Sequence, residues 1–164
     1  MASRKTFTPS LAGFTLLEIL VVMGLVLMVV AFGLIVSFDD YRGFTFRNER
    51  DIVVSVIQKA RGQAINNMCF GAGCTDGKAH GVYFGIPGQY VVFQGASYAT
   101  RDTAVDEVIE ARDKASVLSG MQSVVFGRLR ADATTAGGAT LTISQPGHTS
   151  TITIEPEGRV WWTN

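Results

Sequence analysis

The sequence predicts an α+β fold, in which one long N-terminal helix packs against an antiparallel β-sheet. The first part of the chain is apolar, at first without a break and then with the three- and four-residue spacing of a helix face. The second part is rich in glycine, threonine and β-branched residues in short runs, which are turn and strand signals. With 164 residues, the chain can form one small globular domain beside the helix, but not two.

The apolar run extends from Phe14 to Phe38 and contains one ionisable side chain, Glu18. A helix of about 25 residues spans roughly 37 Å, which exceeds the ~30 Å hydrocarbon core of a bilayer. Arg4 and Lys5 precede the run, so the positive-inside rule keeps the N-terminus in the cytoplasm and places the rest of the chain outside. A lone carboxylate in such a span is costly, and it marks Glu18 as a functional candidate.

After Asp39 and Asp40 the helix is predicted to continue as an amphipathic segment to Met68. Its apolar residues recur at helical spacing and should cover one face of the sheet. They are Val53, Val56, Ile57, Ala60, Ala64 and Met68.

Two hairpins are predicted in the second part of the chain. Val82–Phe84 and Tyr90–Phe93 are apolar runs separated by a Pro87-Gly88 turn. Residues 141–144 and 151–154 alternate apolar and β-branched side chains around the turn at Gln145–His148.

Shorter elements are predicted between and after these hairpins. Ser97–Asp106 should be a loop, and Glu107–Arg112 a short strand rather than a helix. Turns are expected at Leu118-Ser119-Gly120 and Ala136-Gly137-Gly138. Further strands are expected over Ser123–Phe126 and Arg159–Trp162.

The junction Gly13-Phe14-Thr15-Leu16-Leu17-Glu18 resembles the prepilin cleavage site of type IV pilins and type II secretion pseudopilins. The order of elements is similar to that of the GspH/FimT-like minor pilins and pseudopilins. Two short segments are also similar to that family: Ala60-Arg61-Gly62-Gln63-Ala64 late in the helix, and Gly158-Arg159-Val160 at the start of the terminal strand. The resemblance implies a pilin-like fold in four parts. These are a leader peptide at 1–13, a transmembrane or filament-core helix at 14–38, its amphipathic continuation at 39–68 and a β-rich head at 69–164.

The resemblance also implies a function as a structural or assembly subunit of a filament. A prepilin peptidase would cut between Gly13 and Phe14 and methylate the new N-terminus at Phe14, and Glu18 would guide assembly. The implied partners are that peptidase, other pilins or pseudopilins and the inner-membrane assembly platform. The chain would sit in the inner (cytoplasmic) membrane as a single-pass protein with its head outside the cytoplasm, and then in the filament.

Several alternatives remain open at this stage. Glu18 can neutralise the new amine of Phe14, or it can reach the lipid headgroups instead. The segment can also be an uncut anchor. The head can be a binding protein, an adhesin or a DNA-uptake receptor, that uses the filament only as a carrier.

Cys69 and Cys74 follow the helix on the outward side, where an even count favours a disulfide. Free thiols, or zinc held with His80 or His148, are the alternatives. We expect both histidines at solvated turns, and we expect no bound metal or cofactor.

The charge pattern gives little support to nucleic-acid binding. There are 14 basic and 14 acidic residues, and removal of Arg4 and Lys5 leaves 12 against 14, a net of −2. Some FimT-like proteins carry a C-terminal Gly-Arg-x-Arg element linked to DNA uptake, but here Trp161 follows Gly158-Arg159-Val160. The same Gly-Arg-x-Arg pattern occurs earlier, at residues 127–130, where Arg128 and Arg130 would share one strand face and could contact DNA phosphates or form a solvated edge. Any residual DNA binding should come from Arg128, Arg130 and Arg159. No nucleophile triad or phosphate loop is present, so we expect no enzyme.

Overall fold

The computed structural model describes residues 13–72, 74–130 and 132–164, with the backbone alone for 35–39. It is an α+β structure with antiparallel sheets, as the sequence predicts. The chain divides into an N-terminal unit that ends at Tyr41 and a C-terminal unit, Arg42–Asn164. The predicted leader, apart from Gly13, lies outside the described residues.

The first element, α1, is a helix over Leu16–Ile65. Between Leu16 and Leu34 it is long and apolar enough to cross a membrane, with a mean hydropathy of 2.7. Its C-terminal end is fixed by Asn67, which has φ 54°. The amides of Asn67 and Met68 donate to the carbonyls of Ala64 and Gln63, a Schellman motif. The helix therefore ends before Met68, which was predicted to be its last buried residue and is 41% exposed.

Five strands form the larger sheet, in the order β3-β2-β1-β5-β6. The strands β1 and β2 form the first predicted hairpin, and Gly88 in its turn has φ 73°. The predicted loop before β3 contains two short 3₁₀ helices, η1 (Tyr98–Thr100) and η2 (Thr103–Val105). The strand bounds are β1 His80–Ile86, β2 Gln89–Gln94, β3 Glu107–Glu110, β5 Ser123–Phe126 and β6 Ala133–Ala136.

A second sheet contains four strands in the order β4-β7-β8-β9. The strands β7 and β8 form the other predicted hairpin, and they pair in continuous register from Thr140 opposite Thr153 to Gln145 opposite His148. The strand bounds are β4 Val117–Gly120, β7 Thr140–Gln145, β8 His148–Ile154 and β9 Val160–Thr163.

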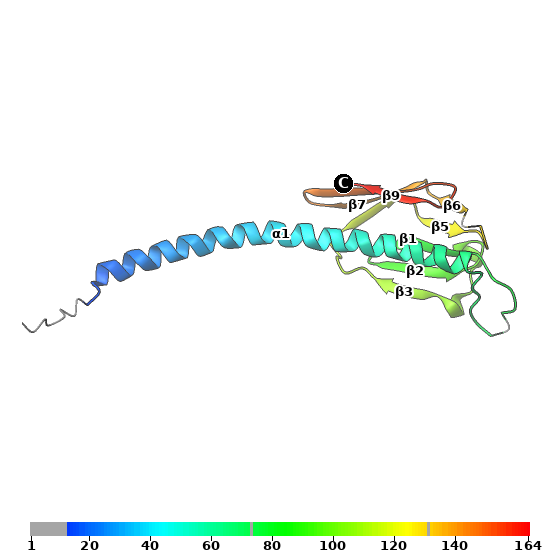
Figure 1. Ribbon diagram of the computed structural model, residues 1–164, viewed down its shortest axis with the longest axis horizontal. Coiled ribbons are helices and arrows are strands. Elements are labelled where there is room, and N and C mark those ends of the chain that lie inside the picture. Colours follow the sequence, from blue (N-terminus) through cyan, green and yellow to red (C-terminus); the bar gives the residue numbers. More distant parts are fainter. Residues whose placement is uncertain (1–12, 73, 131) are drawn as a thin grey trace, which may run out of the picture. The chain divides into compact units, whose positions relative to one another are not determined.

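The expectation of a single sheet is therefore wrong, because the strands divide into two sheets that share one core with α1 (Figure 1). The turn predicted at Leu118-Ser119-Gly120 is also wrong. These residues form most of β4. Their own strand propensity is weak, but they pair with β7, and the backbone hydrogen bonds of that pairing hold them in a strand. The strand β6, with the sequence Ala-Thr-Thr-Ala, was not predicted, and it forms against β5.

The core lies between α1 and the inner faces of both sheets. From α1, Val53, Val56, Ile57, Ala60 and Ala64 are 0–3% exposed, so the predicted amphipathic face is confirmed up to Ala64. Val82 and Val124 of the five-stranded sheet and Leu141, Ile143 and Ile152 of the four-stranded sheet are each 0% exposed in the same cluster. One helix face thus joins the two sheets.

Candidate functional site

The start of α1 is built by a local capping motif. Thr15 immediately precedes the helix, and its Oγ1 accepts a hydrogen bond of 3.2 Å from the amide of Glu18. The spacing Thr15-x-x-Glu18 is that of a capping box, in which an acid at the third helical position also meets the positive end of the helix dipole. Glu18 thus has a local structural reason to occupy this position, and its side chain is exposed.

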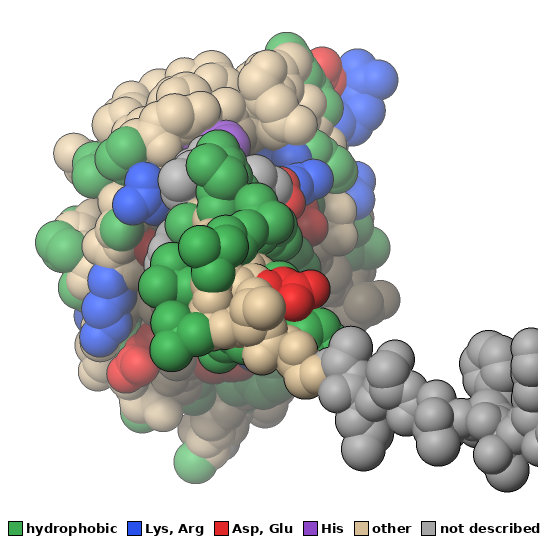
Figure 2. All heavy atoms as spheres, turned by 90° about the vertical axis from the view of Figure 1, so that its left-hand side faces the viewer, with side chains coloured by type: hydrophobic (Ala, Val, Ile, Leu, Met, Phe, Trp, Pro, Cys, Tyr) green, Lys and Arg blue, Asp and Glu red, His purple; other side chains and the backbone are tan. Residues whose placement is uncertain are grey.

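The surface of α1 around Glu18 is almost entirely apolar. The large hydrophobic side chains from Leu16 to Leu34 are 49–83% exposed, and they point in all directions around the helix. Figure 2 shows hydrophobic side chains gathered over this end of α1. An exposed apolar surface of this extent marks a site of contact with lipid or with other proteins.

The two cysteines are joined, as the sequence analysis expected. Cys69 and Cys74 form a disulfide with their Cα atoms 5.8 Å apart. The loop that it closes is held to β2, since the Phe70 amide donates to Gln94 Oε1 at 2.7 Å and Gln94 Nε2 donates to the Phe70 carbonyl at 3.2 Å.

His80 is not a solvated turn residue, and that expectation is wrong. It lies in β1, is 1% exposed, and its Nε2 is 3.0 Å from the Met68 carbonyl oxygen. Burial lowers the pKa of His80, and the hydrogen bond to Met68 opposes this only in part. The neutral ring thus donates its Nε2–H to the chain just after α1. His148, which was also expected at a solvated turn, is the half-buried first residue of β8 and stacks against Phe46, with ring centroids 5.5 Å apart.

The three arginines proposed for DNA contact lie in different settings. Arg128 and Arg130 do not share a strand face, because β5 ends at Phe126 and residues 128–130 form a turn, with Leu129 at φ 64°. Arg128 Nε donates to Asn67 Oδ1 at 2.6 Å, and its Nη2 is 3.8 Å from Asp76. Arg159 pairs with Glu155 at 2.7 Å. Arg128 thus contacts the C-terminal end of α1, where a positive charge interacts favourably with the helix dipole.

A buried carboxylate on α1 was missed by the sequence analysis. Glu49 is 0% exposed, and both of its oxygens are used. Oε1 accepts from the Tyr90 hydroxyl and Oε2 accepts from the Asp113 amide at 2.9 Å. Burial and the hydrogen bond to Glu49 raise the pKa of Tyr90. The sequence does indicate that Glu49 is buried, because it lies four residues before Val53 and eight before Ile57, on the same helix face.

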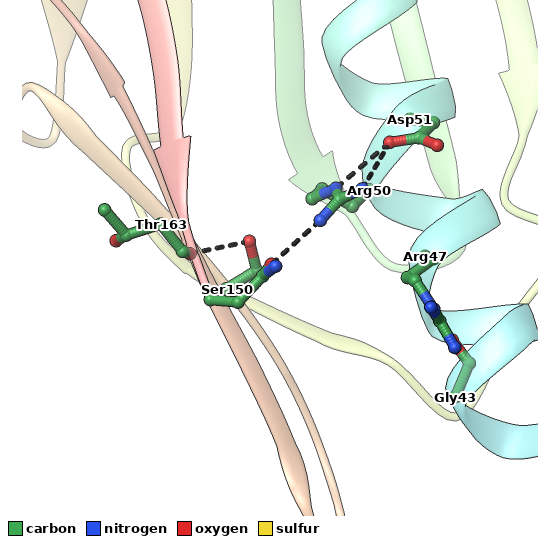
Figure 3. A network of polar contacts seen from close by, with 7 residues as sticks. Gly43, Arg47, Arg50, Asp51, Ser150 and Thr163 are labelled. Carbon is green, nitrogen blue, oxygen red and sulfur yellow. Dashed lines mark hydrogen bonds and ion pairs between the residues drawn. The ribbon is translucent and has the colours of Figure 1, made fainter. Parts of the chain in front are cut away.

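A second missed group, Arg50, connects α1 to the last strand. It is 9% exposed, and its Nη1 donates to Asn164 Oδ1 at 2.8 Å while Nη2 pairs with Asp51 at 2.9 Å (Figure 3). The guanidinium carbon lies 5.5 Å from the ring centre of Trp162. Nearby, Ser150 Oγ donates to the Thr163 carbonyl at 2.9 Å. These contacts fix the position of β9 at the edge of its sheet.

No protein-family model, curated protein or solved structure matches this chain.

Proposed function

We propose that this chain is a minor pilin or pseudopilin, a structural and assembly subunit of a type IV pilus or a type II secretion pseudopilus. One observation carries the proposal. The first part of α1 exposes its large apolar side chains all around the helix, and its one carboxylate, Glu18, stands in the first turn directly after the Gly13-Phe14 junction.

A helix of this kind needs a cover that the described part of its own chain does not supply. A bilayer provides one cover, and a bundle of equivalent helices provides another, because both are apolar on all sides. A subunit that is stored in the inner membrane and then moves into a filament uses the same surface in turn. The inner-membrane assembly platform and other pilins or pseudopilins are the partners in that transfer.

Cleavage after Gly13 by a prepilin peptidase gives Glu18 its second role. The new amine of Phe14, which the same peptidase would methylate, carries a positive charge at the membrane boundary. The carboxylate of Glu18 can neutralise this amine on a neighbouring subunit, which removes the cost of two unpaired charges in an apolar bundle.

The capping motif determines how this role must be tested. Glu18→Gln removes the charge but keeps a side chain that can complete a capping box. We expect Glu18→Gln to insert into the membrane at normal levels, since it removes a charge from the span. Because an unpaired amine in an apolar bundle is unfavourable, we expect the variant to fall about tenfold in sheared filaments.

Thr15→Ala is the matched control for this experiment. It removes the cap hydroxyl, at a cost of about 1 kcal/mol to the helix start, but leaves the carboxylate in place. We expect near-normal filament levels for this variant. If Glu18→Gln assembles normally, or if Thr15→Ala loses filaments to the same extent, the role of Glu18 lies in capping and the pairing proposal is wrong.

A DNA-uptake receptor has weaker support. Arg128 and Arg159 already have acidic or amide partners within the head, and Arg128 and Arg130 lie on a turn rather than along one strand face. We expect weak, strongly salt-dependent DNA binding at most.

A further inference from the structure

The two sheets differ in what lies on their outer faces. On the five-stranded sheet, Tyr98 of η1 stacks on Tyr83 with ring centroids 3.7 Å apart, and it meets the edge of Phe93 at 5.6 Å. Phe93 is 1% exposed as a result. The outer side chains of the four-stranded sheet are exposed or half-buried instead.

The open outer face is an array of hydroxyl groups. On β7 and β8 the buried residues alternate with hydroxyl residues, and directly opposed residues of an antiparallel pair share a face. The opposed outer pairs are Thr140 with Thr153, Thr142 with Thr151, and Ser144 with Thr149. Neighbouring strands are ~4.8 Å apart and alternate residues of one strand ~6.8 Å apart, so these hydroxyls form a regular grid.

The edge strand β9 adds an aromatic ring to this grid. Trp161 lies opposite Thr153 on the outer face and is 46% exposed. Trp162 lies opposite the buried Ile152, so its side chain is on the other face of β9, where it meets Arg50 and is 43% exposed. Thr163 continues the outer row next to Thr151. The two neighbouring tryptophans therefore lie on opposite faces of the same strand.

The chemistry of this face restricts its partner. None of these outer side chains of β7, β8 and β9 is charged, although 17% of the chain is charged, so the face has no counter-charge for an anion or a cation. Each hydroxyl can donate and accept, which matches a partner with the same property. A purely apolar partner would leave the hydroxyl rows without hydrogen bonds, at a cost for each. A chain of uncharged sugars has hydroxyls at the ring edge and C–H faces that stack on an indole.

We propose that the outer face of β7, β8 and β9 is a binding surface for a neutral polysaccharide, with Trp161 as the stacking platform and the threonine rows as hydrogen-bonding groups. This role goes beyond assembly into a filament. It does not require cleavage after Gly13, so its failure would leave the filament proposal intact.

The test uses the full chain in a detergent without a sugar headgroup. Soluble oligosaccharides of the cellulose, chitin and starch series are titrated while tryptophan fluorescence is recorded. Because the chain has 2 tryptophans, Trp162→Phe leaves Trp161 as the only reporter, and Trp161→Phe leaves Trp162. We expect a saturable emission shift from Trp161 with at least one series, and a much smaller one from Trp162.

Affinity is then compared between matched variants. We expect Trp161→Ala to weaken binding at least tenfold and Trp162→Ala less than threefold, with Thr142→Val/Thr151→Val, which keeps the side-chain shape, in between. Binding should be unchanged from about 0.05 to about 0.5 M salt, because no charge is involved. Equal losses in both tryptophan variants, steep salt dependence, or no binding to any of the three series would overturn the proposal. So would a change of oligomeric state in Trp161→Ala, since the face would then be an interface between copies.

Discussion

The two halves of α1 differ in apolar content and in exposure. Val, Ile, Leu and Phe make up 16 of the 25 residues from Leu16 to Asp40, but 8 of the 25 residues from Tyr41 to Ile65. From Leu16 to Leu34, large apolar side chains are 49–83% exposed, whereas Val53, Val56 and Ile57 in the second half are 0–3% exposed. The difference is one of apolar content and of pattern. The second half limits its apolar residues to a face that the sheets can cover, and the first half does not. An apolar helix therefore finds its partner inside or outside the chain according to its periodicity.

The two glutamates sharpen the contrast. Glu18 is exposed in the first turn, and apart from Thr15 its neighbours in the described part of α1 are apolar. Glu49 is buried and fully hydrogen-bonded by Tyr90 and Asp113. A carboxylate in the second half has its partners within the head, so it stabilises the fold. Glu18, in the first half, lacks such partners in the described part of the chain, and in the proposed function its partner is the new N-terminus of its own or another subunit.

The largest expected effect is a difference in the free energy of unfolding between variants in the two halves of α1. Ile57→Ala should lower the free energy of unfolding of the head by about 3–4 kcal/mol, because it opens a cavity in a core position that is 0% exposed. Leu25→Ala, at a position that is 60% exposed, should change it by less than about 0.5 kcal/mol. Denaturant unfolding of the full chain in detergent, followed by the tryptophans of β9, measures both. Equal losses would remove the contrast between the halves.

A smaller effect is expected at the buried carboxylate. Glu49→Ala should cost about 2–3 kcal/mol, since it leaves the Tyr90 hydroxyl and the Asp113 amide buried without their acceptor. Asp51→Ala is the control on the same helix; its carboxylate is 61% exposed and its ion pair with Arg50 should contribute below about 1 kcal/mol. A Glu49→Ala variant as stable as Asp51→Ala would show that the network contributes nothing.

The disulfide, which lies just after the second half of α1, should have the smallest effect. Loss of the Cys69–Cys74 link, by reduction or by Cys69→Ser/Cys74→Ser, should destabilise the head by about 2 kcal/mol, because the closed loop is short. Membrane retention should not change. Unfolding curves with and without reductant test the first part, and identical curves would contradict it.

Most of the fold could be predicted where a strong local pattern coincides with the final packing. The hairpin β1–β2 has apolar runs and the hairpin β7–β8 has alternating residues, each around a Pro-Gly turn, and the second half of α1 has helical periodicity. Residues whose structure depends on distant partners were not predictable in this way. Gly120 reads as a turn residue but ends β4, and β6 needs β5 to form a strand. The division into two sheets also depends on which strands pair, which alternation alone does not specify.

The candidate sites follow the same rule. The junction at Gly13-Phe14 and the cysteine pair are local in sequence and could be found there. The contacts of Glu49 with Tyr90, and of Arg50 with Asn164, join residues far apart in the chain. The alternation of hydroxyl residues in β7 and β8 can be seen in the sequence. Whether these hydroxyls are exposed depends on which face of the sheet is buried, and only the assembled core determines that.

The central claim is that the first half of α1 enters a filament after cleavage at Gly13-Phe14, and the intact mass of the membrane-extracted chain tests it most directly. The chain is expressed with and without a prepilin peptidase, together with a Gly13→Leu variant that should resist cutting. With the peptidase, we predict the mass of residues 14–164 plus one methyl group. Without it, or in Gly13→Leu, the leader should remain. An uncut chain in the presence of active peptidase, or an N-terminus at any residue other than Phe14, would contradict the account.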